Sequence, residues 1–144
     1  MAAEVEFFYD FASPYTYLAS TQMKGLAERT GAKIQWRPFV LGGVFQATEN
    51  RAPFTVKAKA LHMSADLERW GRLYGVPISM PTIFPMKTIT ALRMALAADR
   101  EGAIVPFSDG KLTPSFDSSH SCLKSSFFVF LQSAMKPVQN FKII

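Results

Sequence analysis

The sequence predicts an α/β fold that opens with a strand, a helix and a second strand. Three observations indicate this order in the chain of 144 residues. Residues 5–9 are almost all β-branched or aromatic, which is typical of a strand. An apolar helical stripe follows and stops at Gly31, a residue type that commonly ends helices. Residues 33–39 then alternate between apolar and polar side chains, so we expect a βαβ unit with parallel strands and a right-handed crossover.

The first strand and the first helix meet at Ser13. The apolar run at 5–9 has almost no break, so we expect that strand to be buried on both faces. Ser13 is a preferred N-cap residue, and Pro14 takes the first helical position, where its missing N–H costs nothing. The Ser13 hydroxyl therefore lies at the positive end of a helix, just after the first strand. Unpaired N–H groups at this end favour a negatively charged group. The alternative is that Ser13 is only a helix cap.

The buried faces of these elements follow from their periodicity. The helix after Pro14 has one apolar stripe, and the second strand has two apolar positions. These positions are Tyr17, Leu18, Leu26 and Ala27 in the helix, and Ile34 and Trp36 in the strand.

Residues 41–75 read as a loop, a polar turn and a long helical stretch. We expect 41–45 to be a loop that enters a helical segment, and 48–53 to be a turn closed by proline. From 54 to 75 the pattern is helical, and Ser64 followed by acidic residues leaves open whether one helix or two form there. The apolar face of this stretch consists of Met63, Leu67, Trp70 and Tyr74.

The next segment is an extended connection followed by another helix. Residues 78–86 contain two prolines, which favour extended backbone. Thr88 then caps a helix whose apolar positions Ile89, Leu92 and Leu96 follow at helical spacing. This helix is expected to end near residues 100–102.

The composition changes beyond residue 106. Residues 107–144 contain no arginine and a single alanine. We therefore divide the chain into a first part, 1–106, and a divergent tail, 107–144, which is too small to be an independent domain. Within the tail, 113–114 and 118–121 read as loop, and 127–131 reads as a strand or a buried helix. A domain boundary and a truncated or frame-altered gene end both explain such a change.

Composition and charge exclude several classes of protein. With 49% hydrophobic and 19% charged residues, the chain is globular and its length fits one domain. The net charge of +5 is spread along the chain, which argues against nucleic-acid binding. The one cysteine, Cys122, excludes an internal disulfide and a Cys-x-x-Cys redox pair, so we expect a cytoplasmic protein. Neither a signal peptide nor an apolar run of membrane-spanning length is present, so no membrane partner is expected.

Four blocks of the first hundred residues resemble, in order, the 2-hydroxychromene-2-carboxylate isomerases and their relatives, the kappa-class glutathione transferases. These families belong to the thioredoxin-like group that contains disulfide-bond oxidoreductase A. The blocks are residues 8–15, residues 38–45, residues 66–70 with 74–77, and residues 84–85 followed by 91–93.

This resemblance implies a thioredoxin-like fold with a helical insertion at about 42–100. It implies glutathione as the cofactor, bound through Ser13, Pro14, Tyr15 and Asn50. Ser13 stands where redox relatives keep a nucleophilic cysteine, and the absence of a cysteine pair excludes a dithiol oxidoreductase. The implied activity is isomerisation of a small aromatic acid or, alternatively, glutathione transfer to an aromatic compound. A homodimer is also implied.

The local chemistry of Ser13 agrees with this role. A free thiol is mostly protonated at neutral pH, because its pKa is roughly 8.5. The Ser13 hydroxyl can donate a hydrogen bond to a thiolate, and the helix dipole adds attraction. Ser13 would thus be the catalytic residue that activates the thiol of bound glutathione, and glutathione would supply the nucleophile.

The sequence departs from the family pattern at three points. Lys87 stands where relatives often carry asparagine, and it either holds a substrate carboxylate or is an ordinary solvated lysine. The tail from about 107 does not resemble the family. In relatives, a cis-proline loop and two further strands complete the fold. We find no counterpart of them here, since Pro137 lacks the sequence that surrounds the proline of that loop. An inactive, truncated relative is therefore the alternative to an enzyme.

The remaining candidates carry weaker signals. Trp70 is either a core residue or part of an aromatic substrate pocket. Asp10 is either a buried acid that orients the Ser13 turn or a simple turn-forming aspartate. His62, His120 and Cys122 have no partners at metal-ligand or catalytic spacing, so no metal site is expected.

Overall fold

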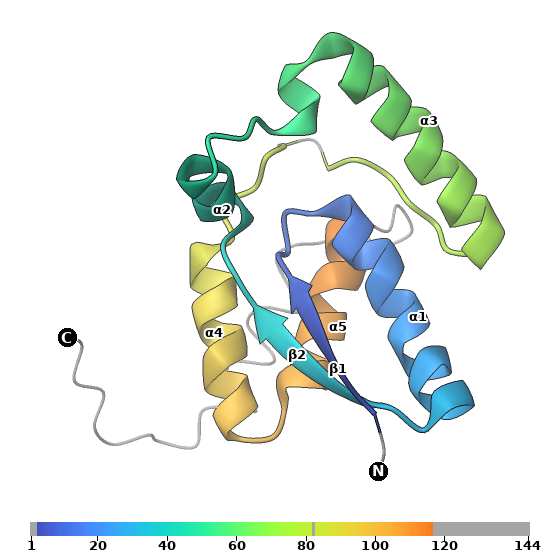
Figure 1. Cartoon of the computed structure of the whole chain (residues 1–144), viewed down its shortest axis with the longest axis vertical. Helices are drawn as coiled ribbons and strands as arrows, with labels where there is room; N and C mark the ends of the chain where they lie inside the picture. The colour runs from blue at the N-terminus through green and yellow to red at the C-terminus, as the bar shows by residue number, and fades with distance from the viewer. Residues whose placement is uncertain (1–2, 82, 117–144) are drawn as a thin grey trace.

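The computed structural model describes residues 3–81 and 83–116. In Figure 1 the two strands lie between α1 and α4, and α3 lies apart from them, beyond the start of α1. The elements of the described residues are, in order, β1 (Glu4–Tyr9), α1 (Pro14–Thr30), β2 (Lys33–Pro38), α2 (Leu41–Ala47), the 3₁₀ turn η1 (Pro53–Thr55), α3 (Lys57–Tyr74), α4 (Ile89–Arg100) and α5 (Ile104–Phe116).

The predicted βαβ unit is confirmed. β1 and β2 pair in parallel, with Glu4 opposite Lys33 and Tyr9 opposite Pro38. α1 connects them and ends at Gly31, whose φ of 67° is left-handed and whose N–H donates to the Ala27 carbonyl at 2.8 Å. Glycine adopts this conformation without the steric cost that a side chain would add.

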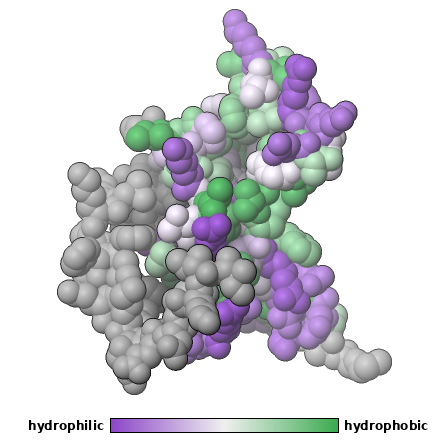
Figure 2. Space-filling model, turned by 90° about the vertical axis from the view of Figure 1, so that its left-hand side faces the viewer, coloured by the Kyte–Doolittle hydropathy of each residue, from purple (hydrophilic) through white to green (hydrophobic). Residues whose placement is uncertain are grey.

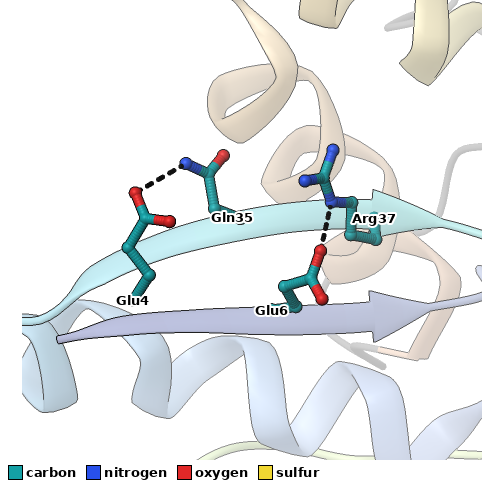
Figure 3. A network of polar contacts seen from close by, with 4 residues as sticks. All are labelled: Glu4, Glu6, Gln35 and Arg37. Carbon is teal, nitrogen blue, oxygen red and sulfur yellow. Dashed lines mark hydrogen bonds and ion pairs between the residues drawn. The ribbon is translucent and has the colours of Figure 1, made fainter.

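The expectation that β1 is buried on both faces is wrong. Its residues alternate, and Phe8 on the outer face is 58% exposed. Polar pairs occupy that outer face: Arg37 Nε donates to Glu6 Oε1 at 2.9 Å, and Gln35 Nε2 donates to Glu4 Oε1 at 3.5 Å (Figure 3). Exposed pairs of this kind add little stability, so the strand depends on its inner face.

Aromatic rings from β1, the turn after it, β2 and α5 contribute to the core beneath the inner face of the sheet. The Tyr9 ring lies 5.4 Å from that of Trp36 and 5.5 Å from that of Phe11, both edge to face. Phe11 in turn contacts Phe107 at 6.3 Å. Edge-to-face contacts are a preferred geometry for buried rings, and they fix the end of β1 against α5.

Residues 41–45, predicted as a loop, form most of the helix α2. The N–H of Leu41 donates to Oδ2 of Asp10 at 2.8 Å, and those of Gly43 and Val44 donate to the Val40 carbonyl. A side chain from outside the helix therefore satisfies a free N–H group at its start. Sequence patterns contain no signal for a partner 31 positions away.

The predicted helix at 54–75 is one 3₁₀ turn followed by the single continuous helix α3. Gly75 ends α3 in a left-handed conformation with φ of 65°. Of the predicted apolar face, Leu67 is buried, whereas Trp70 and Tyr74 are 40% and 37% exposed. Gly71 is buried instead, because α3 packs closely on the following segment there.

Residues 78–81 and 83–86 form neither helix nor strand, and the helix α4 is confirmed, but the core face of α4 is rotated from the prediction. Leu92 and Ala95 are buried, whereas Ile89 and Leu96 are 52% and 50% exposed. The small Ala95 side chain lets the helix approach the core closely. Thr88 precedes α4, yet its side chain makes no cap hydrogen bond.

Helix α5 crosses residue 106, where the composition changes. Pro106 lies in its first turn, where free N–H groups make proline tolerable. Residues 113–114, predicted as loop, are helical here, and Phe107, Leu112 and Phe116 are buried in the core. The division of the chain at 106 stays a prediction. The predictions made for other residues of the tail lie outside the described residues; these are 118–121, 127–131, His120, Cys122 and Pro137.

The side of the molecule that carries α2 and α4 exposes apolar groups. Figure 2 shows hydrophobic atoms in the middle of this side, with hydrophilic groups above and below them. Exposed apolar residues of these elements include Val44 in α2 and Ile89 and Leu96 in α4. None of the helices in the described part of the chain is both long and apolar enough to cross a bilayer.

Candidate functional site

Ser13 forms the N-cap of α1, as the sequence predicts. Its backbone is extended (φ −96°, ψ 114°), and its Oγ accepts a hydrogen bond from the N–H of Thr16 at 3.2 Å. Pro14 occupies the first turn and is buried. The cap bond uses a lone pair of Oγ, so the hydroxyl proton of Ser13 can still be donated to a ligand.

The turn before Ser13 is built on Asp10, which is 2% exposed. Its carbonyl accepts from the N–H of Ser13 at 3.0 Å, and its Oδ1 accepts from the N–H of Ala12 at 3.0 Å. Oδ1 also accepts from the Thr88 hydroxyl at 2.7 Å. Of the two predicted roles for Asp10, the structure supports the buried acid that orients the Ser13 turn.

Tyr15, in the first turn of α1, contacts the helix α3. Its hydroxyl donates to Oδ2 of Asp66 at 3.0 Å, and its side chain is 41% exposed. Partial burial and then the bond to Asp66 raise the pKa of the Tyr15 phenol to about 12, so the hydroxyl keeps its proton at neutral pH. The first turn of α1 is therefore tied to the helical region between β2 and α5.

Trp70 lies one helical turn after Asp66 on α3, and therefore on the same side of that helix. It is 40% exposed, and its ring contacts that of Tyr74 at 5.3 Å. Its position beside the Tyr15 contact is compatible with a substrate role, and its exposure argues against a purely core role.

Asn50 and Lys87 lie in exposed segments. Asn50 follows α2, and its Oδ1 accepts from the N–H of Arg51 at 2.8 Å. Lys87 directly precedes Thr88, whose hydroxyl is bound to Asp10. Among the described residues, no hydrogen bond joins either side chain to Ser13. Their binding roles stay predictions.

Two residues that contact this site, Asp66 and Thr88, could not be assigned to it from the sequence. Asp66 was read as part of a helical pattern and of a block that resembles the family, and not as a partner of Tyr15, although it lies four residues before Trp70 and thus on the same face of the helix. Thr88 was read as a helix cap, whereas its hydroxyl donates a hydrogen bond to Oδ1 of Asp10. Within residues 3–81 and 83–116, no three histidine, cysteine or acidic side chains form a group that could hold a metal ion.

The comparison with protein families finds one matching model. Residues 4–119 match the DSBA-like thioredoxin domain, and the match therefore continues past the composition change at 106. A solved structure of 2-hydroxychromene-2-carboxylate isomerase superposes with a TM-score of 0.75 at 22% sequence identity. The superposition covers 91% of this chain and 64% of that chain, and it supports the fold.

Named relatives match a little more than half of the chain. A 2-hydroxychromene-2-carboxylate isomerase from Sphingobium xenophagum is 40% identical over 86 residues, which are 58% of this chain and 44% of the relative. One from Pseudomonas putida is 37% identical, covering 54% and 39%. Glutathione S-transferase kappa 1 from Caenorhabditis elegans is 32% identical, covering 56% and 36%. The matched segment thus spans less than half the length of each of these relatives.

Proposed function

This chain belongs to the family of DSBA-like thioredoxin domains, and from that premise we propose that it is a glutathione-dependent enzyme of small aromatic compounds. The first candidate reaction is the isomerisation of an aromatic acid, the activity for which two of the relatives are named. The observation that carries the proposal is the Ser13 hydroxyl at the start of α1, whose oxygen accepts the cap hydrogen bond from Thr16. A hydroxyl that accepts a hydrogen bond can still donate its proton. The family and its thioredoxin-like fold are those that the sequence resemblance predicted.

The residues around Ser13 fit the sulfur end of glutathione. The hydroxyl of Ser13 is a hydrogen-bond donor, and the first turn of α1 carries no acidic residue that would repel an anion. When bound, glutathione supplies a thiolate nucleophile for the conjugated substrate. A lowering of a thiol pKa by about two units requires roughly 2.7 kcal/mol of differential stabilisation.

Ser13 and the helix together can supply that stabilisation. A hydrogen bond to a charged group contributes about 1.5–3 kcal/mol, and the helix dipole adds about 0.3–1 kcal/mol. Ser13 would donate its proton to a negatively charged sulfur while its lone pair stays engaged with Thr16. Pro14 leaves no N–H in the first helical position and fixes the backbone beside the hydroxyl.

The remaining roles extend this assignment. Tyr15 and Asn50 would contact the tripeptide of glutathione. Because the Tyr15 hydroxyl is engaged by Asp66, its ring and backbone are the groups left for that contact. Lys87 would hold a substrate carboxylate, and Trp70 would lie against an aromatic ring. The apolar surface beside α2 and α4 supports an aromatic substrate (Figure 2).

The second candidate function is glutathione transfer, for which the Caenorhabditis elegans relative is named. An isomerase releases glutathione unchanged, whereas a transferase leaves it bound to the product through a thioether. Analysis of product mass with a conjugated aromatic acid distinguishes these two outcomes.

Calorimetry tests the proposed function. We expect millimolar glutathione to release binding heat, and S-methylglutathione, which has no ionisable thiol, to bind more weakly. Ser13→Ala should lower turnover far more than glutathione affinity, because the hydroxyl acts mainly on the thiolate. Ser13→Thr, which keeps a hydroxyl, is the matched control. An absence of binding heat with the native chain would refute the glutathione assignment and favour the inactive relative.

A further inference from the structure

Asp10 makes more hydrogen bonds than a turn requires. Its Oδ1 accepts from the N–H of Ala12 two residues later, which is the ordinary pattern of a turn-forming aspartate. Two further bonds reach distant segments: the Leu41 N–H donates to Oδ2 at 2.8 Å, and the Thr88 hydroxyl donates to Oδ1 at 2.7 Å. A local turn has no need of either.

These bonds join three helix beginnings at one buried point. Ala12 lies just before α1, Leu41 is the first residue of α2, and Thr88 immediately precedes α4. The Asp10 carbonyl also accepts from the N–H of Ser13 at 3.0 Å. The backbone that carries the Ser13 hydroxyl is therefore held by a residue whose side chain is itself fixed from two other elements.

Burial makes this arrangement sensitive to the loss of any one bond. Asp10 is 2% exposed and Thr88 is 8% exposed, so water cannot replace a missing partner without rearrangement. In the described residues every buried side-chain oxygen and nitrogen has a partner. Removal of the Thr88 hydroxyl would leave Oδ1 of Asp10 with the Ala12 N–H alone.

We propose that Asp10, held by Thr88 and the Leu41 N–H, is the positioning residue that fixes the Ser13 hydroxyl at the start of α1. The inference rests on the proposed function, because the position of this hydroxyl matters only if it serves a negatively charged ligand. It adds to that function a buried network that determines how well the site stabilises an anion.

A cysteine at position 13 reports on this network without glutathione. In a Cys122→Ser background, Ser13→Cys places the sole thiol at the site, and the pH dependence of its alkylation by iodoacetamide gives its pKa. A thiol at a helix N-terminus ionises below its ordinary pKa of about 8.5. We expect such a lowered value for the thiol at position 13 in the otherwise native chain.

Thr88→Val then tests the positioning role. Valine has the shape of threonine but donates no hydrogen bond, so we expect the pKa of the probe thiol to rise by at least about half a unit. Thr88→Ser, which keeps the hydroxyl, should restore the lowered value. Ser20→Ala is the matched control: it removes a hydroxyl of equal burial that donates to the Tyr17 carbonyl within α1, and it should leave the pKa unchanged.

Asp10→Asn distinguishes two effects of Asp10 on the pKa of the thiol at position 13: the effect of its negative charge and the effect of the hydrogen bonds that hold the turn. Loss of a negative charge alone would lower the pKa of the neighbouring thiol, whereas loss of the Leu41 bond and displacement of the turn would raise it. We expect a rise. An ordinary thiol pKa in the native background, no rise in Thr88→Val, or a fall in Asp10→Asn would each overturn the inference. Failure of the proposed function would appear separately, as absence of glutathione binding by the chain with Ser13 intact.

Discussion

The hydroxyl of Tyr15 donates a hydrogen bond of 3.0 Å to the carboxylate of Asp66, 51 positions later in the chain. This bond joins the first turn of α1, which carries Ser13, to the middle of α3. Helix α3 therefore contacts the candidate site directly. Trp70, one turn further along α3, lies on the same side of the helix as Asp66.

A double-mutant cycle with Tyr15→Phe and Asp66→Ala, each of which removes one partner of the hydrogen bond, measures the energy of this contact. Because both side chains are accessible to water, we expect a coupling energy of about 0.5–1 kcal/mol in the free energy of unfolding. Urea denaturation of the native chain, both single variants and the double variant supplies the four values. Tyr74→Phe is the control, since its hydroxyl has no hydrogen bond in the described part of the chain, and it should cost almost nothing. Additive single effects would show that the contact does not form in solution.

The cap role of Ser13 predicts a loss of stability that is independent of any ligand. Ser13→Ala removes the acceptor of the Thr16 N–H, so the free energy of unfolding should fall by about 1 kcal/mol. Ser13→Asp retains an acceptor and should recover most of this loss. Equal stability of Ser13→Ala and the native chain in urea would contradict the observed cap.

Gly71 is expected to tolerate no larger residue, because α3 meets the following segment there. A Cβ at this position would lie 2.8 Å from Cγ2 of Ile78 and 3.0 Å from the Val76 carbonyl oxygen. Gly71→Ala should therefore lower the free energy of unfolding by about 1–3 kcal/mol. Gly42→Ala is the matched control, because nothing lies within 4 Å of the added carbon and alanine favours a helix. If both variants were equally stable in thermal denaturation, the close packing of α3 would be wrong.

The buried Tyr9 hydroxyl predicts a loss of stability at high pH. Burial raises the pKa of Tyr9 from 10.0 to about 12, while its hydroxyl forms a 2.6 Å hydrogen bond with Oγ of Ser108. The folded chain then keeps a proton that the unfolded chain loses. This contribution is fully present below pH 10 and is lost as the pH rises toward 12.

Tyr9→Phe isolates that contribution. The variant should be less stable than the native chain at pH 8, because Ser108 loses its buried partner. The difference should shrink by about 1 kcal/mol at pH 11, since phenylalanine does not titrate. Urea denaturation at the two pH values measures the change, and a constant difference would refute the raised pKa.

Local signals predicted the βαβ unit and both ends of α1. Ser13 and Pro14 start the helix and Gly31 ends it through interactions within a few residues, so their meaning can be read in one stretch of sequence. The resemblance of the candidate site to a known family could be read from the sequence for the same reason, because the central residues of the site are consecutive in the chain.

Errors arose where a distant residue decides the structure. Residues 41–45 were taken as a loop that enters a helical segment, because the start of α2 at Leu41 depends on Asp10, far away in the sequence. The face of α4 was misplaced because the small Ala95, rather than the larger Leu96, faces the core. The outer face of β1 was expected to be covered, although its glutamates pair with the polar residues of β2.

We propose that the Ser13 hydroxyl keeps a bound glutathione sulfur negatively charged. The ultraviolet absorbance of the thiolate, followed as a function of pH for the protein saturated with glutathione, measures the pKa of the bound thiol. We expect a bound-thiol pKa about two units below that of free glutathione, and a return most of the way to the free value in Ser13→Ala. A bound thiol that titrates like free glutathione, or that titrates identically in the native chain and in Ser13→Ala, would contradict it.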